Sequence, residues 1–229
     1  MTPAEPRGGA RPLGRGSGAG KLLLFGEHAA VYGYPAVGIR LPRYLEVRLF
    51  QQDNDWQLPS VDPRSETLIR RALDALPEVM GRPVAPCRVD IVGDLPMTVG
   101  LGSSAAFCVA LIRAAEAAKR VAPDGGEEPS GGAGVSARVG DGSAQDQQLV
   151  ALWKQAHALE HVFHGTPSGI DTGLSLLPGT RIIYPRPPEI PDAEPVELPP
   201  AWLVTGAVPR VGTTAELVAG IRSRRDADP

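Results

Sequence analysis

Hydrophobic and polar positions form short blocks along most of the chain, and these blocks predict interleaved strands and helices. The apolar or alternating runs predict strands at residues 21–25, 36–41, 44–50, 87–92, 180–185 and 201–206. Positions with helical spacing predict helices at residues 62–76, 103–120, 148–165 and 213–225. Asp62 followed by Pro63 is a typical helix start, and Gly165 is a typical stop. The mixed order of elements indicates an α/β or α+β fold.

Three segments lack any such period. We expect a disordered leader at residues 1–19 and a mobile Gly/Ser-rich insert at residues 122–147. The proline-rich residues 185–200 are expected to form a linker. These boundaries divide the chain into an N-terminal domain at residues 20–184 and a C-terminal part at residues 201–229.

Composition narrows the functional classes. The chain has 229 residues, of which 42% are hydrophobic and 21% charged, with a formal net charge of −3. This balance is typical of a globular protein and gives no reason to expect nucleic acid or a membrane as a partner. Cys87 and Cys108 form neither a disulfide framework nor a metal-binding spacing, which favours a reducing, cytoplasmic compartment.

The glycine–serine stretch from Gly100 to Ser104 lies between a predicted strand and a predicted helix. Glycines let the backbone approach a phosphate, helix N–H groups bind anions, and a hydroxyl can hold Mg²⁺. An ordinary tight turn is the alternative. The earlier GRGSGAGK segment is not a Walker A loop, because Arg15 replaces its first glycine and Leu22 its Ser or Thr.

The segment HALEHVFHGTPSGID supports two hypotheses. His157, Glu160 and His161 match the H-x-x-E-H pattern of some zinc peptidases, so a zinc hydrolase is one alternative. The two histidines are also explained as polar-side residues of an amphipathic helix. Glu160 and Asp171, brought together by the glycine-rich turn, could hold a metal and take a proton, or could be a solvated Glu and a turn-forming Asp.

Polar groups also flank the first predicted strand. Lys21 begins it, and His28 follows its end in a Gly-Glu-His sequence. Ligands often bind where strands end. A surface charge and a loop histidine are the alternative.

These segments, in this order, resemble motifs of the GHMP kinases, above all of the members that phosphorylate mevalonate. The matching segments are GKLLLFGEHAAVYGYPAV at 20–37, GLGSSAA at 100–106, HGTPSGID at 164–171 and VPRVGTTAELVAG at 208–220. The resemblance implies an N-terminal α/β domain with a left-handed β-α-β crossover, joined to a ferredoxin-like C-terminal domain. It also implies transfer of the ATP γ-phosphoryl group to the primary hydroxyl of mevalonate, in the mevalonate pathway to isoprenoid precursors, and it allows a homodimer. Members acting on phosphomevalonate are the nearest alternative.

The resemblance assigns roles by position. Asp171 would be the general base, and Lys21 would lie beside it near the reacting groups. Ser104 and Glu160 would be Mg²⁺ ligands, and His28 and Thr214 would lie on the substrate side. The residues that would wrap the ATP phosphates are Thr98, Val99, Gly100, Leu101, Gly102, Ser103 and Ser104.

The sequence departs from the family in three places. Gly18-Ala19-Gly20-Lys21 replaces the usual Ala-Pro-Gly-Lys, and Thr98-Val99 replaces Gly-Ala. The family's C-terminal glycine-rich motif and most of its C-terminal domain are missing, so we expect a C-terminally truncated member. Such a chain is a fragment of a longer enzyme, is completed by another chain, or binds ATP without catalysis.

Overall fold

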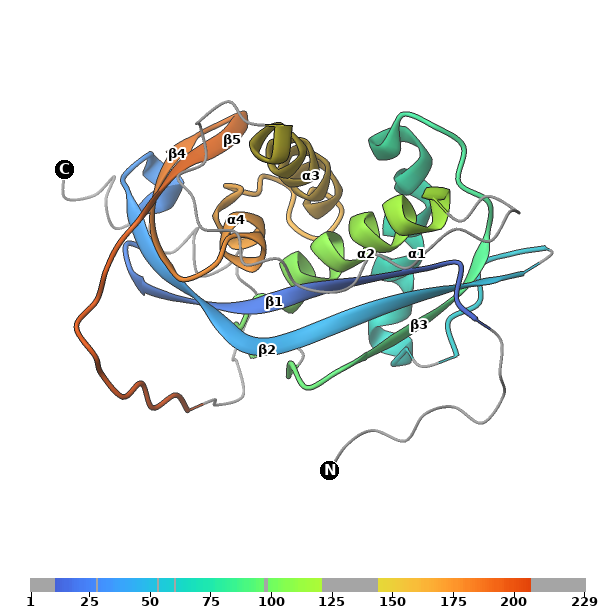
Figure 1. Ribbon diagram of the computed structural model, residues 1–229, viewed down its shortest axis with the longest axis horizontal. Coiled ribbons are helices and arrows are strands. Elements are labelled where there is room, and N and C mark those ends of the chain that lie inside the picture. Colours follow the sequence, from blue (N-terminus) through green and yellow to red (C-terminus); the bar gives the residue numbers. More distant parts are fainter. Residues whose placement is uncertain are drawn as a thin grey trace, which may run out of the picture.

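The computed structural model describes residues 11–27, 29–52, 54–59, 61–96, 99–120 and 144–206. Its elements are β1 (Gly14–Phe25), the 3₁₀ turn η1 (Ala30–Tyr32), β2 (Ala36–Gln51), α1 (Pro63–Met80), β3 (Cys87–Gly93), α2 (Ser103–Arg120), α3 (Ala144–Glu160), α4 (Ile170–Leu176), β4 (Thr180–Arg186) and β5 (Glu189–Pro195). One sheet is packed against helices, and Figure 1 shows α2 running along β1 and β2 with α3 and α4 on the same side. The expected mixed α/β class is confirmed.

The long strand β2 is the centre of the sheet. Along one edge it pairs with β1. Its other edge is shared, because residues 36–39 pair with β4 and residues 45–51 pair with β3. β5 adds to β4, and all of these ladders are antiparallel. They do not test the left-handed β-α-β crossover, which stays a prediction.

The prediction of a disordered leader over residues 1–19 is wrong for residues 14–19, which form the first half of β1. Glycines at every second position face α2, and a Cβ on any of them would lie 2.0 to 2.2 Å from a helix carbonyl oxygen. The close pairs are Gly14 with Ala114, Gly16 with Ala110 and Gly18 with Ala106. The glycines therefore let the strand lie directly on the helix. The glycines recur at every second residue, which is the period of a strand, although a segment so rich in glycine suggests flexibility.

The two strands expected at residues 36–41 and 44–50 are a single strand of 16 residues, β2. Pro42 does not interrupt it, because the register shifts there: Ala19 pairs with Tyr44, and Lys21 pairs with Arg40. A proline has no N–H to donate to a ladder, and a bulge is a position where that loss is tolerated.

The helices α1 and α2 begin where the sequence predicts. In α1, Ile69, Leu73 and Leu76 are buried as expected, whereas Leu68 is 37% exposed. The helix α3 begins at Ala144, inside the predicted insert, and ends at Glu160 rather than near residue 165. Its end is a turn in which the backbone N–H groups of residues 163 and 164 both donate to the Glu160 carbonyl. Residues 121–143, the rest of the insert, lie outside the described residues.

The proline-rich segment is not a linker along its whole length. Its residues 189–195 form β5, where buried Ala193 lies opposite buried Ile183 of β4. β5 is the last strand of the sheet path, and prolines are tolerated on edge strands. Residues 201–206 form no strand, and Trp202 is 99% exposed. The predicted helix at 213–225 lies outside the described residues, together with most of the expected C-terminal part.

The buried apolar side chains form a core between the sheet and the helices. The fully buried Trp153 of α3 is among its largest members, and Leu174 of α4 packs onto Gly38 of β2. Among the described helices, none combines the length and the apolar character needed to cross a bilayer.

Candidate active site

Lys21 and Asp171 form an ion pair between the sheet and α4. The Lys21 Nζ atom lies 3.0 Å from the Asp171 Oδ2 atom. The lysine side chain is 7% exposed, whereas the aspartate side chain is 31% exposed. A buried cation thus lies against a carboxylate that solvent can reach. Such a carboxylate is held in place and can still accept a proton from a bound molecule.

Glu160, the last residue of α3, lies close to this pair. It is 1% exposed, and its Oε2 atom has no hydrogen-bond partner among the described residues. Burial, and then the negative charge of Asp171, raise the pKa of Glu160 to about 8, although Lys21 and the Thr172 hydroxyl oppose the shift. A buried oxygen without a partner is costly. This donor therefore fits a hard cation such as Mg²⁺, which prefers oxygen ligands.

The glycine–serine loop is attached to the strand that carries Lys21. The Lys21 backbone N–H donates to the Leu101 carbonyl over 2.9 Å. Gly102 has a φ of +75°, and a Cβ there would lie 2.6 Å from the Lys21 Cγ atom. The Ser104 hydroxyl, in the first turn of α2, lies 3.2 Å from the His164 Nε2 atom. The N-terminus of α2, which favours anions, is therefore next to the buried lysine.

The structure thus brings together Lys21, Gly102, Ser104, Glu160 and Asp171, which come from β1, the N-terminus of α2, the end of α3 and the start of α4. Val99 and Gly100 lie at the surface on the way into the loop. Three predicted site residues, His28, Thr98 and Thr214, lie outside the described residues.

One of the two histidines, His157, does not match the expected polar helix face. His161 is exposed, but His157 is 7% exposed, and its Nδ1 atom has no hydrogen-bond partner among the described residues. Burial lowers the pKa of His157, and the neighbouring His161 lowers it further. The expectation for His157 is wrong because α3 lies against β5 there: a Cβ added at Gly169 would be 2.7 Å from the Pro191 Cδ atom and 3.3 Å from the His157 Nδ1 atom.

The zinc hypothesis has no ligand set in the described part of the chain. No group of three or more His, Cys, Asp or Glu side chains is placed there to hold a metal ion. The ring centroids of His157 and His161 are 5.3 Å apart, and the His161 Nδ1 atom faces the Gly165 carbonyl instead.

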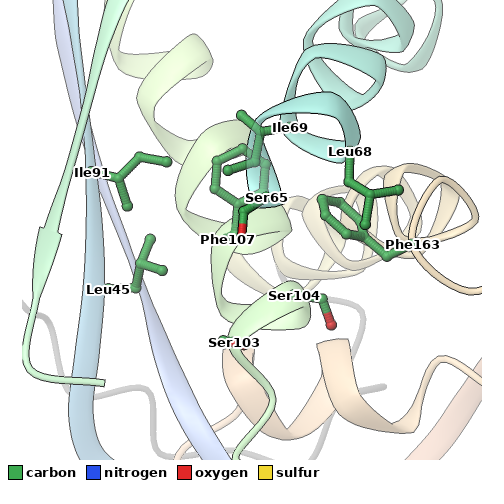
Figure 2. Close-up of a pocket in the computed structure, with 9 residues that line it drawn as sticks. All are labelled: Leu45, Ser65, Leu68, Ile69, Ile91, Ser103, Ser104, Phe107 and Phe163. Carbon is green, nitrogen blue, oxygen red and sulfur yellow. The ribbon is translucent and has the colours of Figure 1, made fainter. Parts of the chain in front are cut away.

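An apolar cavity of about 170 Å³ opens beside the first turn of α2. Figure 2 shows the two serines, Ser103 and Ser104, at one end of it, with the apolar side chains beyond them. The other lining residues are Leu45, Ser65, Leu68, Ile69, Ile91, Phe107 and Phe163. Sequence reasoning missed this cavity because its walls come from five separate elements and segments. The half-exposed Leu68 is explained by its position in this wall.

Three kinds of comparison show which known proteins the chain resembles. Residues 67–126 match the family described as GHMP kinases N terminal domain. The mevalonate kinases of Pyrococcus furiosus and Archaeoglobus fulgidus are 27% and 28% identical to the chain over 93% of its length, and that of Bos taurus is 26% identical over 91%. The chain spans 63%, 64% and 62% of these relatives, respectively.

Solved structures show the same fold. The mevalonate kinase of L. major in complex with R-mevalonate has a TM-score of 0.64 and 19% identity, and covers 96% of this chain and 65% of its own. The Methanococcus jannaschii mevalonate kinase has a TM-score of 0.59 at 18% identity, covering 95% of this chain and 67% of its own. The Streptococcus pneumoniae phosphomevalonate kinase has a TM-score of 0.51 at 18% identity, covering 75% and 48%. Residues 67–126 of the chain are therefore similar to the N-terminal domain of GHMP kinases, and most of its length is similar to mevalonate kinases in sequence and in fold.

Proposed function

We propose that the chain supplies the ATP-binding and proton-transfer groups of a mevalonate kinase, which converts mevalonate to 5-phosphomevalonate. The observation that carries this proposal is the ion pair of Lys21 and Asp171 beside the unpartnered carboxyl oxygen of Glu160. The names of the relatives support the substrate, and the L. major structure contains R-mevalonate.

Asp171 is the general base in this proposal. It accepts the proton of the primary hydroxyl while the hydroxyl oxygen forms a bond to the γ-phosphorus of ATP. The bond between that phosphorus and the β–γ bridging oxygen breaks, and ADP leaves. Lys21 orients Asp171, favours the developing alkoxide and screens the charge of the phosphate. Phosphoryl transfer depends mainly on this kind of positioning and charge neutralisation.

Ser104 and Glu160 are the residues that would hold Mg²⁺. When bound, this ion neutralises phosphate charge. Glu160 fits the role because its Oε2 atom is buried without a partner, although its raised pKa means that it must lose a proton first. The Ser104 hydroxyl, close to His164, supplies a second oxygen at the start of α2.

ATP would bind at the N-terminus of α2. The backbone of residues 98–104 would surround the phosphates, and the apolar cavity beside Ser103 and Ser104 would hold the base. His28 and Thr214 remain proposed substrate-side residues.

A coupled ADP-release assay on the 229-residue chain tests the proposal, with Mg-ATP and mevalonate each omitted in turn. We expect release only when both are present. Asp171→Asn should reduce release at least about a thousandfold, since a general base and its ordered geometry are lost. It should leave nucleotide binding, measured as the Mg-ATP-dependent rise in melting temperature, nearly unchanged.

Asp74→Asn is the matched control, because Asp74 is exposed on α1, away from the ion pair. It should behave as the unmodified chain. If Asp171→Asn kept most of the turnover, the base assignment would be wrong.

Two alternative functions are separated by the same assay. An ATP-binding domain without turnover, one of the alternatives raised by the sequence, is the second candidate. That candidate predicts a rise in melting temperature with Mg-ATP and no ADP release. Release with phosphomevalonate but not with mevalonate would instead support a phosphomevalonate kinase.

A further inference from the structure

The position of Asp171 is not explained by its own helix. Asp171 is the second residue of α4, which has only seven residues. Its N-cap residue Gly169 has no side chain to cap it, and the Ile170 backbone N–H makes a long bond of 3.4 Å to the Ser168 hydroxyl of the preceding turn. A short, weakly capped helix after a glycine-rich turn is marginal by itself. Something outside the turn must therefore fix where this carboxylate lies.

The Gly169 carbonyl is the point at which the turn is held. It accepts hydrogen bonds from the Gly173 backbone N–H at 3.0 Å and from the Thr172 hydroxyl at 3.0 Å. It also accepts one from the Trp153 indole N–H at 3.1 Å. The first two donors belong to α4 itself. Trp153, on α3, is the donor that connects the turn to another element.

The indole ring also fixes the helix by contact. Trp153 is fully buried, and a Cβ on Gly173 would lie 2.3 Å from its Cζ2 atom. At the residue before the helix, a Cβ on Gly169 would lie 2.7 Å from the Pro191 Cδ atom of β5 and 3.3 Å from the His157 Nδ1 atom of α3. The start of α4 is therefore closely packed by both α3 and β5.

We propose that Trp153 is a positioning residue, which sets the place of Asp171 against Lys21 through the Gly169 carbonyl and the backbone of α4. This inference rests on the proposed function of Asp171 as the general base. Lys21 has contacts of its own, a backbone bond to Leu101 and packing on Gly102. The hydrogen bond that ties α4 to β1, from the Ser175 hydroxyl to the Ala19 carbonyl, lies at the other end of the helix, away from the turn. A shift of the turn therefore changes the distance between the lysine and the aspartate rather than moving both together.

The consequence for the reaction is specific. A base displaced by a fraction of an ångström lowers the rate of proton transfer, while ATP at its proposed position by the N-terminus of α2 is held as before. Losing Trp153's hydrogen bond should therefore lower kcat and leave the KM for Mg-ATP unchanged.

Trp153→Phe is the test, because phenylalanine keeps an aromatic ring and removes the N–H donor. We expect kcat to fall about tenfold, the size expected for one lost buried hydrogen bond, with an unchanged KM for Mg-ATP. The amide of Gly173, whose acceptor is the Gly169 carbonyl, should exchange with deuterium faster, whereas the amides of β1 and β2 should not.

Trp56→Phe is the matched control. Trp56 is also buried, at 8% exposed, but it packs near α1, where its carbonyl accepts a hydrogen bond from Arg70. Trp56→Phe loses the same ring volume as Trp153→Phe, so it should lower the melting temperature to a similar extent. It should not lower kcat or change the deuterium exchange of the Gly173 amide.

The outcomes separate this inference from the proposed function. If the unmodified chain does not turn over, the proposed function fails, and exchange at Gly173 still decides whether Trp153 holds the turn. Equal kcat values for the two tryptophan variants, or unchanged exchange at Gly173 in Trp153→Phe, would overturn the inference.

Discussion

The carboxyl group of Glu160 links the site to the stability of the fold. Its ordinary pKa of 4.5 applies to the unfolded chain, and burial beside Asp171 raises the pKa in the folded state to about 8. Between these values the folded state keeps a proton that the unfolded state releases. The stability contributed by the protonated form is therefore full below pH 4.5 and is lost as the pH rises to about 8.

We therefore expect the melting temperature of the chain, without Mg²⁺ or ATP, to fall more steeply over this pH window than that of Glu160→Gln. Thermal unfolding in a chelating buffer at a series of pH values measures both slopes. Glu78→Gln, at an exposed position on α1, is the control and should keep the steeper slope. Parallel curves for Glu160→Gln and the unmodified chain would contradict the raised pKa.

A comparison of Gly169 with Gly179 measures how much stability depends on the close packing around the turn before α4. Both have a φ of +76°, but a Cβ would meet Pro191 and His157 at the first position and nothing within 4 Å at the second. Gly179→Ala should cost about 1 kcal/mol of unfolding free energy, the cost of a left-handed backbone. Gly169→Ala should cost about 2 kcal/mol more, because the added methyl overlaps its neighbours.

Denaturant unfolding of the two variants measures this difference. Equal losses of stability would show that the start of α4 has room to move, and would also weaken the argument for Trp153.

At this scale the sequence located the charged residues but not their surroundings. The spacing of the motifs indicated Lys21, Glu160 and Asp171, and the structure places them together. The burial of His157 could not be predicted, because α3 lies against β5, and β5 is held in place by its pairing with β4.

Among the elements, β1 is the one whose composition is most misleading. Its glycines face the alanines of α2 so closely that the helix backbone occupies the space of a side chain. The same alternation could have predicted a strand, but only knowledge of the partner helix shows why every second residue is glycine. The strand β4 was predicted, but β5 was taken for part of a linker because of its prolines, although prolines are tolerated on an edge strand.

Gly16→Ala tests this contact. A Cβ at Gly16 would lie 2.2 Å from the Ala110 carbonyl oxygen and 2.4 Å from the Ala114 backbone nitrogen. Backbone atoms cannot rotate away as side chains can, so we expect a loss of about 3 kcal/mol in unfolding free energy. Urea unfolding measures the loss.

The control is Ser17→Ala, at the next position, whose side chain points away from the stripe of glycines. It should change the unfolding free energy by less than about 0.5 kcal/mol. If Gly16→Ala lost as little stability as Ser17→Ala, β1 and α2 would be able to move apart without cost.

For the whole molecule, the α/β class and most elements follow from the pattern of apolar positions, because helices and strands each bury one face at their own period. The topology does not follow from that pattern. The apolar cavity beside α2 belongs to this larger scale as well, since Leu45, Ile69 and Phe163 come from widely separated parts of the chain.

Because β3 and β4 share one edge of β2, the strands of the sheet can pair only in a certain order during synthesis. β1, β2 and β3 lie in the first 93 residues and can pair as soon as they leave the ribosome. Residues 36–39 must wait for β4, at residues 180–186. α4 ends four residues before β4, so Asp171 arrives with the strand that fills this gap. A nascent chain thus carries an open half-edge until the segment that holds Asp171, the proposed general base, has been made, and the pairing of β4 with β2 closes this edge as the proposed site is completed.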